Sequence, residues 1–149
     1  MSGFASRWVV LQRHNLGAGD FDADGFVCAE VVDAWLADAR AAYLDKCAVL
    51  QALRERVGGE LQATVTRPPA RDRIGRPTAV IVTAGATALY PDAITLAFRI
   101  RPLGGEGDDG INAACSVVLV DPATGERCEL GDDVRDELIA LEHAAEHVS

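Results

Sequence analysis

The sequence lacks the features that mark several common classes of protein. No apolar run approaches the roughly 20 residues that a helix needs to cross a bilayer, and no charged N-terminal region precedes an apolar one as in a secretory signal. The four cysteines do not have the close spacing of a zinc site or a redox pair; they are Cys28, Cys47, Cys115 and Cys128. We therefore expect free thiols, no metal, no membrane partner and a cytoplasmic location.

An excess of positive charge is also missing. The formal net charge is −9, which argues against a nucleic-acid-binding protein held by phosphate contacts. The arginines are unevenly placed, however, because Arg67, Arg71, Arg73 and Arg76 fall within ten residues.

The usual catalytic templates are absent as well. The sequence contains no G-x-x-x-x-G-K, no H-E-x-x-H and no G-x-S-x-G. The segment GAGDFD (17–22) lacks the third glycine of a dinucleotide-binding fingerprint, because Asp22 stands in its place. These absences give no support to a nucleotide-dependent enzyme, a zinc peptidase or a serine hydrolase.

The composition indicates one globular domain over residues 1–149. The chain is 49% hydrophobic and 25% charged, an ordinary globular mixture, and its length allows a core of useful size. We expect no second domain, because no domain-sized linker or internal repeat is visible.

The spacing of apolar residues from Val31 to Cys47 predicts a helix. Apolar residues recur there at spacings of three and four and share one face of a helix; they are Val32, Trp35, Leu36, Ala39 and Tyr43. A helix of roughly 17 residues is about 25 Å long. Residues 47–57 either continue this helix or form a second short one, which Gly58 and Gly59 end.

Most of the remaining chain is predicted to be β-structure. The expected strands are 7–16, 61–66, 78–90, 93–103, 112–120 and a short return strand, 126–130. Residues 67–77 and 104–110 are expected to be loops. Asp132 or Asp133 is expected to cap a closing helix, with an apolar face made of Val134, Leu138, Leu141 and Ala145. One long helix against an antiparallel sheet is an α+β arrangement.

The segment GDFDADGFV (19–27) places Asp20, Asp22 and Asp24 directly before Gly25. Such spacing opens a calcium-binding loop, in which carboxylates and a glycine turn surround the ion. The end of the loop does not fit, because the twelfth position, where a glutamate is needed, is Val31. No helix is predicted to lead into the segment either. Both departures count against a calcium site.

A longer segment, GDFDADGFVCAEVVDAWLADAR (19–40), resembles the hotdog-fold acyl-CoA thioesterases of the 4-hydroxybenzoyl-CoA thioesterase type. The segments LYPDAITLAFRI (89–100) and DPATGERCELGDDVRDEL (121–138) are similar to later parts of that family. The resemblance implies an antiparallel sheet wrapped around the long helix. It also implies a homodimer, or a tetramer built from dimers, with active sites at the subunit interface.

The resemblance also implies catalytic roles. It makes Asp22 the catalytic carboxylate, which attacks the thioester carbonyl or activates a water. A carboxylate just before a helix is stabilised as an anion by the positive end of the helix dipole. The backbone N–H groups near Cys28 and Ala29 would stabilise the oxyanion, and Gly25 would allow the tight turn.

The implied substrate is an acyl thioester of coenzyme A or of a carrier protein, with no separate cofactor. We expect Phe26 and Val31 to line the acyl site. Arg71, Arg73 and Arg76 either contact the phosphates of coenzyme A, for which guanidinium groups are suited, or form a solvated loop.

The sequence also allows a non-catalytic interpretation. Many members of the family have His-Val-Asn where this chain has Phe26, Val27 and Cys28, so a non-catalytic hotdog module that binds an acyl thioester is the alternative. Asp20 and Asp24 are expected to shape the turn. His143 and His147 lie one helical turn apart but lack a third metal ligand.

Overall fold

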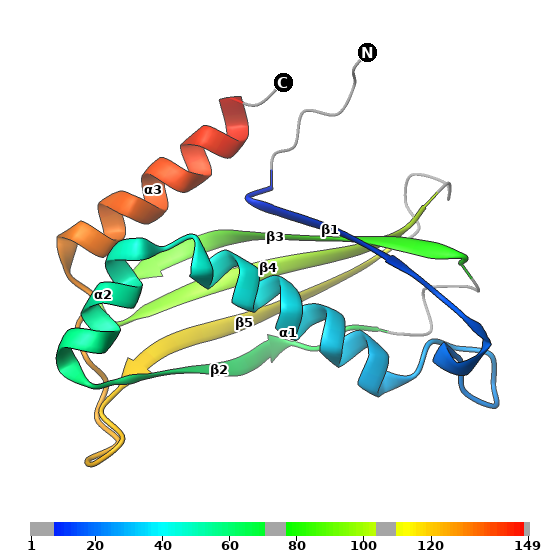
Figure 1. Ribbon diagram of the computed structural model, residues 1–149, viewed down its shortest axis with the longest axis horizontal. Coiled ribbons are helices and arrows are strands. Elements are labelled where there is room, and N and C mark those ends of the chain that lie inside the picture. Colours follow the sequence, from blue (N-terminus) through cyan, green and yellow to red (C-terminus); the bar gives the residue numbers. More distant parts are fainter. Residues whose placement is uncertain (1–7, 71–76, 104–109, 148–149) are drawn as a thin grey trace.

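The computed structural model describes residues 8–70, 77–103 and 110–147. Along the chain the elements are strand β1 (Val10–Asn15), the short 3-10 helix η1 (Ala18–Asp20), helices α1 (Ala29–Asp45) and α2 (Ala48–Val57), strands β2 (Glu60–Arg67), β3 (Ala79–Tyr90), β4 (Ala93–Pro102) and β5 (Ile111–Val120), and helix α3 (Gly131–His147). Figure 1 shows α1 lying across one face of the sheet and α3 rising beyond the end of it.

The five strands form one antiparallel sheet in the order β1-β3-β4-β5-β2. Strands β3, β4 and β5 follow one another as the predicted meander. Strand β2 lies beside β5, so the chain must cross from one edge of the sheet to reach β3. This arrangement confirms the predicted α+β class.

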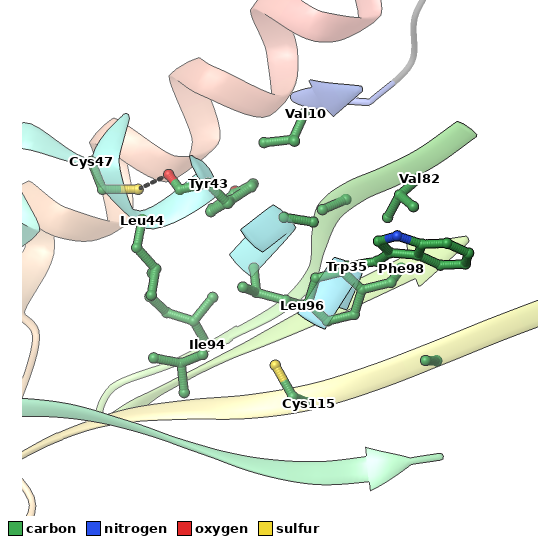
Figure 2. Close-up of a cluster of buried hydrophobic side chains, with 14 of the residues drawn as sticks. Val10, Trp35, Tyr43, Leu44, Cys47, Val82, Ile94, Leu96, Phe98 and Cys115 are labelled. Carbon is green, nitrogen blue, oxygen red and sulfur yellow. Dashed lines mark hydrogen bonds between the residues drawn. The ribbon is translucent and has the colours of Figure 1, made fainter. Parts of the chain in front are cut away.

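Helix α1 is the central element. It begins at Ala29, two residues before the predicted start, and its buried face carries Val32, Trp35, Ala39, Tyr43 and Leu44. These side chains meet the inward residues of the sheet in the cluster shown in Figure 2, which includes Val82, Leu96 and Phe98. The periodicity of the sequence therefore identified the helix and its buried face correctly.

Helix α2 is separate from α1. Lys46 and Cys47 interrupt the helical run, and the Cys47 thiol donates to the carbonyl oxygen of Tyr43 at 3.4 Å (Figure 2). The helix ends at Gly58, whose φ of 63° lies in the left-handed region that glycine adopts at helix ends.

Two predictions near the C-terminus were wrong. Residues 126–130 form no strand; Arg127 makes one isolated bridge to Val120. The Cys128 N–H still donates to the carbonyl oxygen of Leu119 at 2.7 Å, but two residues later the Leu130 N–H donates to the carbonyl oxygen of Pro91 at 2.8 Å. The pairing with β5 is therefore too short to form a strand. Helix α3 already begins at Gly131, so Asp132 and Asp133 lie in its first turn. They still interact favourably with the helix dipole there.

Two carboxylates fasten α3 to the rest of the protein. The Val49 N–H, at the start of α2, donates to both oxygens of Glu137 at 3.0 and 3.1 Å. The Ala86 N–H, beside a bulge in β3, and the Tyr43 hydroxyl both donate to Glu142.

Two buried groups near Glu137 and Glu142, the Tyr43 hydroxyl and the Cys47 thiol, have raised pKa values. Burial, and then the neighbouring Glu142, raises the pKa of Tyr43. Burial, and then Glu137 and Glu142, raises the pKa of the Cys47 thiol to about 12. Both groups are therefore neutral at ordinary pH.

Among the described residues, no helix combines the length and the apolar character needed to cross a membrane.

Candidate functional site

The acidic turn between β1 and α1 is closed by backbone hydrogen bonds. The Asp22 N–H donates to the carbonyl oxygen of Phe26 at 2.8 Å, and the Gly25 N–H donates to the carbonyl oxygen of Asp22 at 3.0 Å. Gly25 has a φ of 87°, a conformation that residues with a Cβ rarely adopt. The sequence DADG (22–25) thus forms a tight loop, which Phe26, Val27 and Cys28 connect to the first residue of α1, Ala29.

The Asp22 carboxylate is held by the loop that carries it. Its Oδ1 atom accepts the N–H groups of Asp24 and Phe26, both at 3.0 Å. Aspartate often closes a turn with its own side chain in this way. The half-buried carboxylate therefore has a fixed orientation.

The three aspartates differ in their contacts. Asp20 accepts the Gly17 N–H on Oδ2 at 2.8 Å. Asp24 is exposed, and its carboxylate has no hydrogen-bond or ion-pair partner among the described residues. Asp20 and Asp22 therefore both shape the loop, whereas Asp24 is a solvated neighbour.

The start of α1 has backbone N–H groups that meet no acceptor in the described part of the chain. Cys28 is the N-cap residue but supplies no side-chain hydrogen bond, and its carbonyl oxygen accepts the N–H groups of Val31 and Val32. Its own N–H donates to the carbonyl oxygen of Asp20 at 2.8 Å. In the described part of the chain, the N–H groups of Ala29 and Glu30 have no acceptor. Of the two predicted oxyanion donors, Ala29 is therefore available and Cys28 is engaged.

No protein-family model and no curated protein matches the sequence. Solved structures do match. A thioesterase from Thermus thermophilus, complexed with coenzyme A and Zn, is 19% identical with a TM-score of 0.64 over 91% of this chain and 96% of that one. A thioesterase-superfamily protein from Jannaschia sp. CCS1 is 18% identical with a TM-score of 0.65 over 91% and 84%. Slr0204, a 1,4-dihydroxy-2-naphthoyl-CoA thioesterase from Synechocystis, is 14% identical with a TM-score of 0.62 over 89% and 97%.

The chain has the hotdog fold. In this hotdog fold the acidic turn follows Asn15, which pairs with Ala79 at the first residue of β3. The turn and the start of α1 therefore share one end of the sheet. Because the sequence identities are this low, the similarity establishes the fold but not the functional residues. The evidence for the functional site is therefore the geometry of this chain.

One pocket among the described residues lies elsewhere in the hotdog domain. It measures about 170 Å³ and is lined by Tyr90, Leu130 and Leu138, among others. Tyr90 is the last residue of β3, so this pocket is at the other end of the sheet from Asp22. The acidic turn is the stronger candidate for the functional site, because a carboxylate and backbone N–H donors without acceptors occur there in one segment of the described chain.

The predicted substrate-contacting residues have different outcomes. Phe26 is 37% exposed beside the turn, and Val31 is half-buried against the core. Arg71, Arg73 and Arg76 lie outside the described residues. In the described ranges, no three His, Cys, Asp or Glu side chains are grouped so that they could hold a metal ion.

Proposed function

We propose that this protein hydrolyses an acyl thioester, with Asp22 as the catalytic carboxylate. The observation that carries the proposal is the fixed Asp22 carboxylate in the loop that leads into α1. The Ala29 and Glu30 N–H groups at the start of that helix have no acceptor in the described residues. A positioned carboxylate and free backbone donors are the two groups that acyl transfer requires.

The reaction has two possible first steps. Either Asp22 attacks the thioester carbonyl carbon and forms an anhydride, which water then hydrolyses, or Asp22 takes a proton from a water that attacks directly. In both routes the thioester carbonyl oxygen becomes negatively charged and accepts hydrogen bonds from the N–H groups of Ala29 and Glu30. The thiolate leaves as the carbon–sulfur bond breaks. In the direct route it takes the proton that Asp22 removed from the attacking water, and in the anhydride route it takes a proton of the water that hydrolyses the anhydride. One oxyanion donor is typically worth a factor of about 10²–10³ in kcat.

The proposed substrate is an acyl-coenzyme A. In support, one of the similar structures is a thioesterase complexed with coenzyme A, and another is a 1,4-dihydroxy-2-naphthoyl-CoA thioesterase. An acyl group on a carrier protein would meet the same chemistry. We propose that Phe26 and Val31 contact an apolar acyl group and that Arg71, Arg73 and Arg76 contact phosphates. Membership of the 4-hydroxybenzoyl-CoA type is part of this proposal.

A second copy of the chain would complete the site. Edge strand β2 directs Leu61, Ala63 and Val65 to the same face as the buried residues of β5, yet Val65 is 65% exposed. An apolar inner face at an open sheet edge favours pairing with another strand. We therefore propose a homodimer joined through β2.

The test is thiol release from a panel of alkyl and aryl acyl-CoA esters by the wild type and Asp22→Asn. Asparagine keeps an Oδ1 atom for the Asp24 and Phe26 N–H groups, so the loop should persist while the carboxylate is lost. Calorimetry with the same esters would identify the non-catalytic alternative, which predicts binding without turnover. An inert wild type, or full activity of the Asn variant, would reject the proposed function.

A further inference from the structure

The face of the sheet turned away from α1, here called the outer face, has an unusual charge. Residues alternate along each strand, so the neighbours of the buried inward residues belong to the outer face. Four arginines lie there, here called the arginine cluster: Arg13 on β1, Arg67 on β2, and Arg99 and Arg101 on β4. The bulge between Val65 and Arg67 turns Arg67 to this face.

The strand register brings the cluster together. Arg13 and Arg101 both pair with Ile81, from opposite sides. With strands about 4.8 Å apart, their Cα atoms are about 10 Å apart. Arg99 is two residues from Arg101, about 7 Å away along the strand. Arg67 pairs with Ala114 on β5, the strand beside β4.

The cluster contrasts with the chain as a whole, which has 23 acidic residues and a net charge of −9. On the outer face of the described strands the only carboxylate is that of Glu60, which pairs with Val120 at the far end of β5. Within the described residues, none of the four arginines forms an ion pair. The arginine cluster is therefore a positively charged patch on a protein whose net charge is negative.

The outer face around the cluster is not covered by any of the described helices α1, α2 and α3 (Figure 1). Small side chains lie between the arginines, including Thr83, Ala97 and Ala114. A small phosphate ester is usually held in a concave site, and the net charge of the chain opposes a nucleic acid. The same face of a second copy would place arginines against arginines.

We propose that the arginine cluster is the docking surface for an acidic protein partner. Guanidinium groups suit carboxylates. Carboxylates two turns apart on a helix are separated by about 10.5 Å, which matches the spacing of Arg13 and Arg101. An acidic helix laid across β1, β3 and β4 therefore fits the cluster, which steers its approach and sets its orientation.

The test is fluorescence anisotropy with a labelled, alanine-based helical peptide of about 20 residues that carries glutamates along one face, at about 50 mM salt, where screening is moderate. We expect the wild type to bind this peptide and not its glutamine counterpart. Arg99→Glu with Arg101→Glu should weaken binding at least tenfold. The matched control, Arg54→Glu with Arg56→Glu on α2, has the same change of net charge and should weaken it less than twofold.

A second pair, Arg13→Glu with Arg67→Glu, lies on the two edge strands and gives an independent reading if the first pair unfolds. The proposal is overturned if the cluster and control pairs weaken binding equally, or if the glutamine peptide binds as well. It is also overturned if coenzyme A or single-stranded DNA displaces the acidic peptide at lower concentration than unlabelled peptide does. Thiol release is measured separately, so loss of docking and loss of hydrolysis are distinguishable.

Discussion

Glu142→Ala should loosen the C-terminal helix, because Glu142 is the acceptor that joins α3 to β3 and α1. The substitution leaves the Ala86 N–H at the β3 bulge and the hydroxyl of fully buried Tyr43 without this acceptor. An unsatisfied buried donor costs about 1–3 kcal/mol. The hydroxyl contact is long, at 3.4 Å, so most of the loss comes from the Ala86 N–H. Ala86 is only half-buried, so water replaces part of the lost acceptor, and we expect about 2 kcal/mol of lost stability in total.

Thermal unfolding followed by circular dichroism measures this loss. For a chain of this size 1 kcal/mol lowers the Tm by about 2–4 °C, so the expected drop is about 4–8 °C. Asp136→Ala is the control, because it removes an exposed carboxylate from the same helix and should change the Tm by less than about 2 °C. Equal Tm values for the two variants would refute the role given to Glu142.

Three further outcomes are expected. The Cys47 thiol has a pKa raised from 9.0 to about 12, so it should not react with a disulfide reagent at about pH 8 until the protein unfolds. Its contribution to the free energy of unfolding is complete below about pH 9 and should disappear as the pH rises towards about 12. Val65→Lys should reduce the dimer fraction in light scattering, whereas Thr64→Lys on the outward side should not; a monomeric wild type would contradict the pairing through β2. Gly25→Ala should lower stability by about 1–2 kcal/mol, because φ is 87° at this residue, and a variant as stable as the wild type in urea would show that the loop tolerates a Cβ.

Periodicity in the sequence was sufficient for the central helix and the meander. The spacing of Val32, Trp35 and Ala39 identifies the buried face of α1, because a helix must bury one stripe of side chains. The start of the helix was misplaced by two residues, since neither Cys28 nor Ala29 has the polar side chain that marks an N-cap.

The position of β2 depends on contacts that no local pattern records. Consecutive strands usually pair with each other, but β2 pairs with β5, more than forty residues later in the sequence. The absence of the strand at 126–130 has a similar cause, because the deciding hydrogen bond joins Leu130 to distant Pro91.

The candidate site was predicted in part. The spacing of the aspartates and the family resemblance singled out Asp22, but the residues alone did not separate it from Asp20 and Asp24. The engagement of the Cys28 N–H was not foreseeable, because its acceptor is the carbonyl oxygen of Asp20, a backbone atom that every residue type possesses. The arginine cluster could not be predicted from the sequence, because it depends on the register of the strands and on the bulge before Arg67.

The measurement that tests the catalytic role of Asp22 most directly is kcat/KM for the best acyl-CoA ester with Asp22→Asn and Asp24→Asn. Both variants remove one negative charge from the same loop, but only Asp22 is held by two backbone donors beside the start of α1. We predict a loss of at least about 100-fold for Asp22→Asn, the lower end of the range for a catalytic acid or base, and less than about threefold for Asp24→Asn. Equal losses, or full activity of Asp22→Asn in a folded protein, would contradict the account.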